Sequence, residues 1–323
     1  MELATTNGGG GPASRPHPAL DDPFTARFTV PVRGGALTVA RAGPPPNEAE
    51  AVVLAVHGVT ASHLTWRTVA RELVATTRAC VLAPDLRGRG RSASLPAPYG
   101  IPTHLPDLLA VLDAAGVERV VVAGHSMGAW VGARLAAEHP ERAAGLVLLD
   151  AGLSFPLTDD DPDEVLQAVV GPAIARLAMT FESAEEYVAL WRAHPAFAHA
   201  WNDDVEAYAR YDMAGGPGAV RCVVSEAAVR KDSVDLLRDG TTRTSVDRVR
   251  APLTLLRAER GLLNGDEPLV PDAAVEEFAA AHPGARIEDV PGVNHYTLVL
   301  GAGHGPLRVA AAISSAIREV VAA

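Results

Sequence analysis

A serine in a glycine-flanked motif is the first residue of this chain that could do chemistry. The motif Gly124-His125-Ser126-Met127-Gly128 follows an apolar, β-branched run typical of a buried strand and precedes a helical pattern over Ala129–Glu138. A strand that turns sharply into a helix needs small residues on both sides of the turn, which the two glycines supply. We therefore predict that Ser126 is a catalytic nucleophile, exposed at the positive N-terminal end of that helix.

A serine hydroxyl is a weak nucleophile, so a neighbouring base must take its proton during attack. The chain has 11 histidines. His295 is the histidine that follows the last strand pattern, Arg286–Val290, in a loop that contains glycine and asparagine. We predict that His295 is the base.

Alternating strand and helix patterns indicate the scaffold that would position these residues. A hairpin comes first, with strands at Phe28–Val32 and Ala36–Arg41. Later strand patterns lie at Ala51–Val56, Cys80–Ala83, Val120–Ala123, Ala144–Leu149, Pro252–Arg257 and Arg286–Val290, and helix patterns at Leu64–Thr76, Leu105–Ala115, Ala129–Glu138 and Leu307–Val321. This alternation is typical of an α/β fold with a mostly parallel sheet and helices on both faces.

Composition and charge exclude several classes of partner. The formal net charge is -11, from 39 acidic and 28 basic side chains, so a nucleic acid backbone or an anionic membrane surface would be repelled. No stretch approaches the roughly 18 apolar residues of a membrane span, and the N-terminus lacks the features of a signal peptide. Cys80 and Cys222 have no metal-ligand or redox spacing. We expect a cytoplasmic protein without a metal or cofactor.

The pattern of elements divides the chain into three parts. Residues 1–22 are rich in glycine and proline and are predicted to form a flexible tail. Residues 23–152 and 250–323 form the predicted core, and residues 153–249 a helical insertion that caps the carboxyl ends of the strands. Amphipathic stretches at Glu164–Met179 and Ala184–Arg192 belong to this cap. Its aromatic residues could line a pocket; they are Trp191, Phe197, Trp201, Tyr208 and Tyr211.

An acidic run in the cap, Asp159–Asp161, could suggest a cation site. We interpret it instead as the solvated start of a helix, favoured by the helix dipole. The glycine and glutamate spacing of a calcium loop is missing there.

Five motifs in a fixed order resemble the α/β-hydrolase family, and the resemblance extends from Phe28 nearly to the end of the chain. They are His57-Gly58 after a strand, the loop Asp85-x-Arg87-Gly88-x-Gly90-x-Ser92, the serine motif, Asp150 at a strand end, and Val293-Asn294-His295-Tyr296-Thr297. The resemblance implies an eight-stranded sheet, a helical cap and a triad in the chain order serine, acid, histidine. It also implies that His57 supports the oxyanion loop and that His125 packs beside the serine turn.

The oxyanion hole of such an enzyme needs two backbone N–H groups directed at the developing negative oxygen. Met127, directly after the nucleophile, is expected to supply one of them. By analogy with the family, Val59 is expected to supply the other.

The acid of the triad has more than one candidate. In most relatives it follows the strand that corresponds to Pro252–Arg257, but this chain has Gly261 where the aspartate is expected. A less common arrangement places the acid after the strand that follows the serine turn, which here is Asp150. Asp150 is our preferred candidate, and Asp266 and Glu259 remain open as alternatives.

These features predict a serine hydrolase that cleaves a small-molecule carboxylic ester or lactone through an acyl-enzyme intermediate. A serine rather than an aspartate at position 126 argues against epoxide hydrolases and haloalkane dehalogenases, which need a carboxylate nucleophile. Carbon-carbon bond hydrolases and thioesterases use the same triad and remain alternatives. A low-turnover ligand-binding receptor is a further alternative, because fold alone does not imply function. The chain could also form a homo-oligomer.

Overall fold

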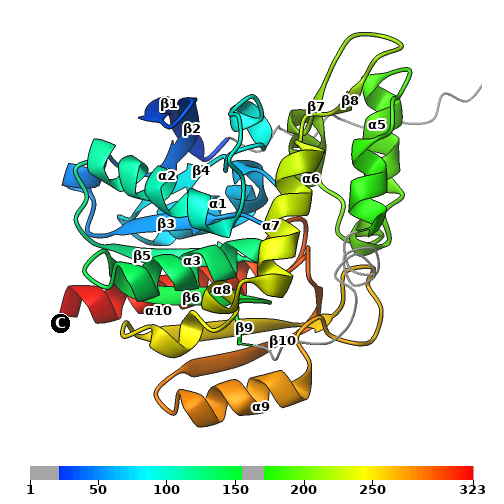
Figure 1. Ribbon diagram of the computed structural model, residues 1–323. Helices are drawn as coiled ribbons and strands as arrows, with labels where there is room; N and C mark the ends of the chain where they lie inside the picture. Colours follow the sequence, from blue (N-terminus) through cyan, green and yellow to red (C-terminus); the bar gives the residue numbers. More distant parts are fainter. Residues whose placement is uncertain (1–21, 155–170, 323) are drawn as a thin grey trace, which may run out of the picture.

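A computed structural model describes residues 22–154 and 171–322, and its centre is an eight-stranded sheet in the order β1-β2-β4-β3-β5-β6-β9-β10 (Figure 1). The strands are β1 (Phe24–Val32), β2 (Gly35–Ala42), β3 (Val52–Val56), β4 (Cys80–Pro84), β5 (Val120–His125), β6 (Ala143–Leu149), β9 (Leu253–Arg260) and β10 (Arg286–Asn294). The predicted hairpin is β1 and β2, which pair antiparallel. β2 is also antiparallel to β4, and the remaining neighbours pair parallel. The prediction of a mostly parallel eight-stranded α/β sheet is confirmed.

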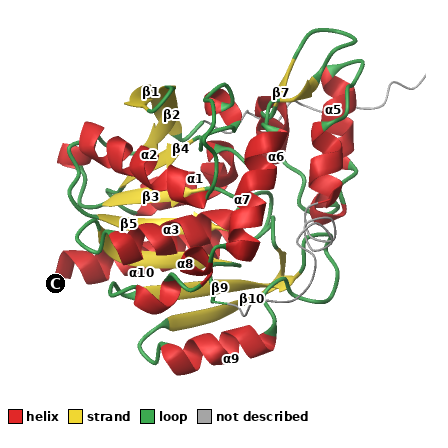
Figure 2. Ribbon diagram, viewed as in Figure 1, coloured by secondary structure: helices red, strands yellow, loops and turns green. Residues whose placement is uncertain are grey.

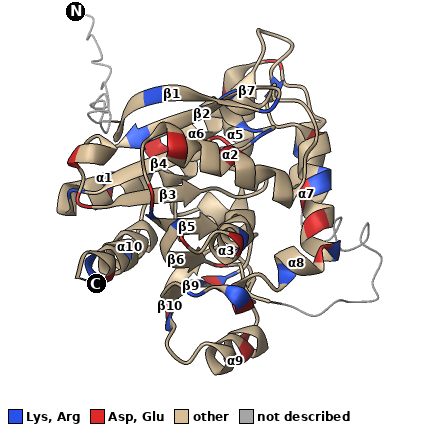
Figure 3. Cartoon of the chain, turned by 60° about the vertical axis from the view of Figure 1, so that its left-hand side comes forward, with Lys and Arg blue, Asp and Glu red and all other residues tan. Residues whose placement is uncertain are grey.

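The central strands are apolar along their whole length because helices cover both faces of the sheet. Every residue of β3, β5 and β6 is buried, and the ribbon of β3 carries no charged residue in Figure 3. Alternate residues enter two separate cores, as Val53 and Leu54 do. The first core includes α1 (Arg67–Thr76) and α10 (Gly305–Ala322), and the second includes α2 (Ile101–Ala114), α3 (Met127–Glu138) and α9 (Asp272–Ala281) (Figure 2).

Two helices of this core differ from the sequence prediction. α2 begins at Ile101, earlier than the predicted Leu105. Its start is fixed from a distance, because carboxylates of α7 (Glu226–Arg238) accept hydrogen bonds from the backbone N–H groups of Gly100 and Ile101. α9 is absent from the predicted elements, and Phe278 is its one fully buried residue, so its apolar periodicity is weak.

Helices dominate the described residues between β6 and β9. Residues 171–177 are helical, and they are followed by α5 (Ala184–Arg192), α6 (Asp203–Tyr211), α7 and α8 (Gly240–Arg243). α5 has the bounds that the sequence predicts, and its Ser183 side chain accepts a hydrogen bond from the backbone of Glu186. In Figure 1 α5 and α6 lie to the right of the sheet; that this region caps the strands stays a prediction.

Short elements complete the described chain. β7 (Met213–Ala214) and β8 (Arg221–Cys222) form a two-stranded sheet within the insertion, which no strand pattern predicts because two residues give no periodicity. The 3₁₀ helices are η1 (Pro46–Glu48), η2 (His63–Trp66), η3 (Gly90–Ser92), η4 (Pro195–Phe197) and η5 (Val246–Arg248). None of the helices in the described ranges is long and apolar enough to cross a membrane.

Several sequence predictions fall outside the described residues. The proposed tail, apart from residue 22, and the acidic run Asp159–Asp161 lie there. The helix pattern Glu164–Met179 is described from residue 171 onward. The three-part division at residues 22, 152 and 249 therefore stays a prediction.

Candidate active site

The turn between β5 and α3 holds Ser126 in a strained backbone conformation. Its φ is 57° and its ψ is -131°, in a region that side-chain-bearing residues rarely adopt. The neighbouring glycines are required by contact: a Cβ on Gly124 would lie 2.3 Å from the carbonyl oxygen of Gly128, and a Cβ on Gly128 would lie 2.1 Å from that of Val56. The surrounding packing thus holds Ser126 at the N-terminus of α3.

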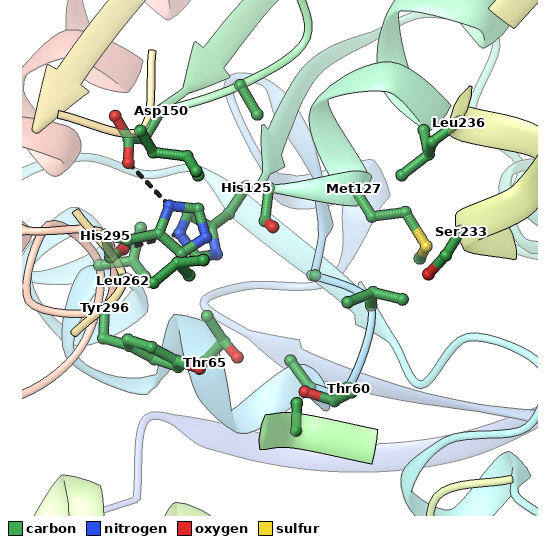
Figure 4. Close-up of a pocket in the computed structure, with 18 of the residues that line it drawn as sticks. Thr60, Thr65, His125, Met127, Asp150, Ser233, Leu236, Leu262, His295 and Tyr296 are labelled. Carbon is green, nitrogen blue, oxygen red and sulfur yellow. Dashed lines mark hydrogen bonds and ion pairs between the residues drawn. The ribbon is translucent and has the colours of Figure 1, made fainter. Parts of the chain in front are cut away.

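Asp150 and His295 are joined by a buried hydrogen bond. Asp150 follows β6 and His295 follows β10, and the Oδ2 atom of Asp150 lies 2.7 Å from Nδ1 of His295 (Figure 4). The other oxygen of Asp150 accepts a hydrogen bond of 3.0 Å from the backbone N–H of Ala258 in β9. Asp150 is 0% exposed and His295 3% exposed. With Nδ1 donating to the carboxylate, Nε2 of His295 is left as the proton acceptor.

The two alternative acids lie in different surroundings. The side chain of Asp266 is 94% exposed and pairs with Arg260 at 3.5 Å. Glu259 is exposed and accepts a hydrogen bond from the backbone N–H of Gly292. Asp150 is the candidate whose carboxylate the structure brings to His295.

Two further histidines hold the loops around the site. His125 donates from Nε2 to the carbonyl oxygen of His295 at 2.9 Å, and burial lowers its pKa well below the usual value, which keeps the ring neutral. The Nδ1–H of His57 donates to the carbonyl oxygen of Gly58 at 2.8 Å, while its Nε2 accepts from the backbone N–H of Leu86 at 3.0 Å. Burial lowers the pKa of His57 to about 3. Each ring is thus hydrogen-bonded to backbone, and the supporting roles that the resemblance implies stay predictions.

The backbone after β3 lies against the serine. A Cβ on Gly58 would come within 3.4 Å of Ser126 Oγ. The carbonyl oxygen of the next residue, Val59, accepts a hydrogen bond of 2.9 Å from Arg89 Nε, which fixes the direction of this loop. Met127 is the first residue of α3, so its N–H has no acceptor within the helix. Val59 and Met127 both line the cavity that contains Ser126.

A buried carboxylate braces the same loop, through partners that the sequence reasoning missed. Asp85 accepts hydrogen bonds of 2.9 Å from the backbone N–H and from Nδ1 of His63, and one of 2.6 Å from the hydroxyl of Tyr211 in α6. Burial alone would raise the pKa of Asp85, but the contacts with His63 and Tyr211 bring it to about 2. Tyr211 lies 126 residues away along the chain, so no local pattern could have indicated this contact.

One cavity of about 780 Å³ is lined by Ser126, Asp150 and His295, together with Val59 and Met127. Figure 4 shows Asp150 and His295 on one side of it and Met127, Ser233 and Leu236 on the other. Most of its wall is apolar, with contributions from Leu153, Leu190, Leu236, Leu237, Leu262, Leu263, Leu269, Val270, Val299 and Leu300. Such a site suits a ligand with a substantial hydrocarbon part.

Some of the aromatic residues named from the sequence line the cavity, and others pack behind it. Trp191 and Tyr208 line the cavity. Phe197 packs against Trp191 at a ring-centroid distance of 6.1 Å, and Tyr211 contacts Asp85 as described above. Arg176 and Ser233 also line the cavity, and the sequence reasoning did not single them out.

Neither cysteine enters this site. Cys80 and Cys222 are free and buried, and burial raises the pKa of each to about 11. Within residues 22–154 and 171–322, no three His, Cys, Asp or Glu side chains are grouped as a metal site would require.

Comparison with known proteins places the chain in a family. The model of the alpha/beta hydrolase fold matches residues 51–302. Lipase LipV of Mycobacterium tuberculosis is 41% identical over 119 residues, which cover 37% of this chain and 43% of that protein. The 2-hydroxymuconate semialdehyde hydrolase of Pseudomonas sp. is 40% identical over 104 residues, which cover 32% and 36%. These matches span less than half the length of either relative.

A solved structure is similar to this protein over most of the chain. The crystal structure of E-2-(acetamidomethylene)succinate hydrolase superposes with a TM-score of 0.72 at 20% identity, and the superposition covers 91% of this chain and 99% of that one. At this identity the likeness shows the fold. With the family match over residues 51–302, it follows that the chain belongs to the α/β-hydrolase family.

Proposed function

We propose that this protein is a serine hydrolase that cleaves a carboxylic ester or lactone through an acyl-enzyme intermediate. The observation that carries the proposal is the buried 2.7 Å hydrogen bond between Asp150 and His295, on the same cavity as the strained Ser126. A base oriented by a carboxylate beside a serine at a helix N-terminus is the arrangement that nucleophilic acyl transfer needs.

In the proposed reaction Ser126 Oγ attacks the substrate carbonyl while His295 Nε2 takes the hydroxyl proton. Asp150 accepts the Nδ1–H hydrogen bond, which keeps the ring oriented and stabilises its positive charge. The proton then passes from His295 to the departing alcohol oxygen, and Ser126 is left as an ester. In the second half, His295 activates a water molecule that releases the acid and restores the serine.

The backbone N–H groups of Val59 and Met127 would stabilise the negative oxygen in both halves of the reaction. One such donor lowers the barrier by about 3 kcal/mol. The contact of His57 Nδ1 with the Gly58 carbonyl supports this role, because that carbonyl and the Val59 N–H belong to one peptide group, which is thereby oriented before substrate binds.

Hydrolysis of p-nitrophenyl esters from acetate to decanoate tests the proposal. We expect turnover that Ser126→Ala lowers by about 10³-fold or more, while Ser233→Ala, which removes another buried hydroxyl from the same cavity, changes it little. A fluorophosphonate should label the wild type at Ser126. A folded protein that neither hydrolyses the series nor reacts with the fluorophosphonate would contradict the proposal and favour the ligand-binding alternative. Labelling without ester turnover would favour the carbon-carbon or thioester alternatives.

A further inference from the structure

The cavity wall contains a buried guanidinium that the proposed triad chemistry does not use. The Arg176 side chain is 7% exposed, and its Nη1 atom lies 2.6 Å from Asp212 Oδ2 and 2.5 Å from the hydroxyl of Tyr187. Nη1 also lies 3.2 Å from Sγ of Cys222. The second nitrogen, Nη2, is buried and has no hydrogen-bond partner in the described part of the chain.

The indole beside this guanidinium carries a second unpaired donor. The Cζ atom of Arg176 lies 4.7 Å from the centroid of the Trp191 ring. Nε1 of Trp191 is buried and likewise lacks a partner among the described residues. Buried donors in folded proteins are normally paired, so two neighbouring unpaired donors on one cavity wall point to a ligand group.

The charge of the wall favours an anion at this place. Arg176 is the one Lys or Arg among the described residues that line the cavity, and the one lining carboxylate, Asp150, is already bonded to His295 and Ala258. Asp212 is not among the lining residues. Its Oδ2 atom takes the contacts with Arg176, Tyr187 and Cys222, and its Oδ1 atom is buried without a partner among the residues that the structure describes. Asp212 therefore anchors the Nη1 edge of the guanidinium and leaves the Nη2 edge unpaired.

The guanidinium is linked to the proposed base through a chain of aromatic contacts. Trp191 lies 6.4 Å from the ring of Tyr296, which in turn lies 5.8 Å from the ring of His295. Two aromatic rings thus lie between Arg176 and His295 along this wall. A group held at Arg176 would be a fixed part of the substrate, away from the bond that breaks.

We infer that the substrate carries a carboxylate at its end distant from the scissile ester, and that this carboxylate binds Arg176 Nη2 with Trp191 Nε1 as a second donor. The inference rests on the proposed function, because it places substrate in the cavity of Ser126 and His295. Both donors are shielded from water, so the carboxylate must displace a neighbouring side chain, most directly the Trp191 ring that lies over the guanidinium. The substrate class is therefore the half-ester of a dicarboxylic acid, or a lactone with an acidic side chain, in an otherwise apolar binding site.

The experiment compares two matched substrates. The mono-p-nitrophenyl esters of adipic and suberic acid carry a free carboxylate, and the corresponding p-nitrophenyl methyl diesters differ from them only in being uncharged there. We expect the wild type to prefer the acid by about tenfold or more in kcat/KM, as a charge-assisted hydrogen bond in a desolvated site would give. An equal rate for the two, or a preference for the methyl diester, would overturn the inference.

The variants separate binding from folding. Arg176→Met combined with Asp212→Asn removes both buried charges together, and should bring the acid-to-methyl ratio of kcat/KM close to one. Arg192→Met, on α5 beside Trp191 but with an exposed side chain, removes the same charge outside the cavity and should keep the wild-type ratio. If the double variant does not fold, Trp191→Phe keeps a ring at this position, removes Nε1–H and should still lower the ratio. A ratio unchanged in both Arg176→Met/Asp212→Asn and Trp191→Phe would contradict the assignment.

A binding measurement distinguishes failure of this inference from failure of the proposed function. Monomethyl suberate should bind to wild type, with a change in tryptophan fluorescence as Trp191 moves, and dimethyl suberate should bind less tightly. Such binding without hydrolysis of any ester would leave the carboxylate site intact and overturn the proposed function. Equal hydrolysis of the acid and the methyl diester, with no tighter binding of monomethyl suberate, would support the proposed function and overturn the carboxylate site.

Discussion

The parallel core and the helical region between β6 and β9 differ in how much buried charges contribute to their packing. In the core, β3, β5 and β6 are buried apolar runs between two layers of helices. The helical region packs on that core through apolar side chains, such as Phe197, Val205 and Tyr208, and buried charges also join the two. Asp204 of α6 accepts two hydrogen bonds of 2.7 Å from Arg71 of α1, and Asp232 of α7 pairs with Arg89 at 2.5 Å.

The difference follows from the physics of the two interactions. Burial of apolar surface is non-directional, so it drives the sheet and its helices together without selecting one exact placement. Ion pairs and hydrogen bonds have geometric requirements, so a few of them can set where a helix lies on a finished core. The helices that form the far wall of the cavity are thereby positioned against Ser126 and His295 by contacts that lie outside the cavity.

The two regions also contribute different things to the proposed site. The core supplies Ser126, Asp150 and His295, each directly after a parallel strand. The helical region supplies Arg176 and Trp191 on the facing wall. Substitutions in the core should therefore alter turnover for every substrate, and substitutions in the helical region should alter selectivity or the attachment of that region.

The largest expected effect is on the core side of this comparison. Asp150→Asn should lower kcat by about 10³- to 10⁴-fold, because the amide no longer stabilises the charged ring of His295. Ester hydrolysis at saturating substrate measures this kcat, and a urea unfolding curve shows whether the variant is folded. Asp266→Asn is the matched control and should leave kcat close to wild type, since that side chain is 94% exposed. Near-normal activity in Asp150→Asn, or a large loss in Asp266→Asn, would reverse the assignment.

The attachment of the helical region gives the next largest effect. Asp232→Ala leaves Arg89 and His104 without their shared buried carboxylate, and should lower the free energy of unfolding by about 3 kcal/mol. Activity should fall as well, because Arg89 holds the carbonyl of Val59. Arg230→Ala removes a partner of an exposed pair on the same helix, α7, and should cost about 0.5 kcal/mol or less. Equal losses in the two variants, measured by urea unfolding, would show that the buried pair does not hold this helix.

Acid should weaken the same attachment by a smaller amount. The pKa of Asp85 is about 2 in the folded protein. The pKa values of Asp204 and Asp232 are lowered as well: burial raises them, but the contacts with Arg71 and with Arg89 lower them by more. The unfolded chain, with aspartate pKa values near about 3.9, binds more protons in acid, so stability is fully present above about pH 5 and declines as pH falls from about 4 toward 2. Asp85 alone should contribute about 2.5 kcal/mol to this decline.

Urea unfolding at pH 7, 5, 4 and 3 measures the acid effect. Tryptophan fluorescence, which includes Trp191 of the helical region, should report unfolding at a lower urea concentration than far-ultraviolet circular dichroism does at pH 3. Asp85→Asn should make the pH dependence shallower. Stability that stays constant down to pH 3 would contradict the view that these carboxylates attach the helical region.

Local patterns predicted most of the core and little of the helical region. The segment from Val120 to Glu138 was predictable because a buried parallel strand is apolar throughout and the helix after it has a clear period. The start of α2 at Ile101 was not, because its N-terminal N–H groups are capped by Asp232 and Asp235 from more than 130 residues away. The inner face of α7 is partly polar, because Asp232, Ser233 and Asp235 are buried there, and this weakens its amphipathic pattern.

For the proposed site, the sequence by itself singled out Ser126 and His295. The glycines around Ser126 are required by close backbone contacts, and His295 follows the last strand, so each residue stands in a recognisable sequence pattern. No sequence pattern distinguishes Asp150 from Asp266 and Glu259 as the acid. The choice depends on which carboxylate meets the His295 ring when β6, β9 and β10 lie side by side. The pairing of Asp150 with His295 and the unpaired edge of Arg176 were decided by tertiary structure, because both depend on distances between segments that the order of residues does not specify.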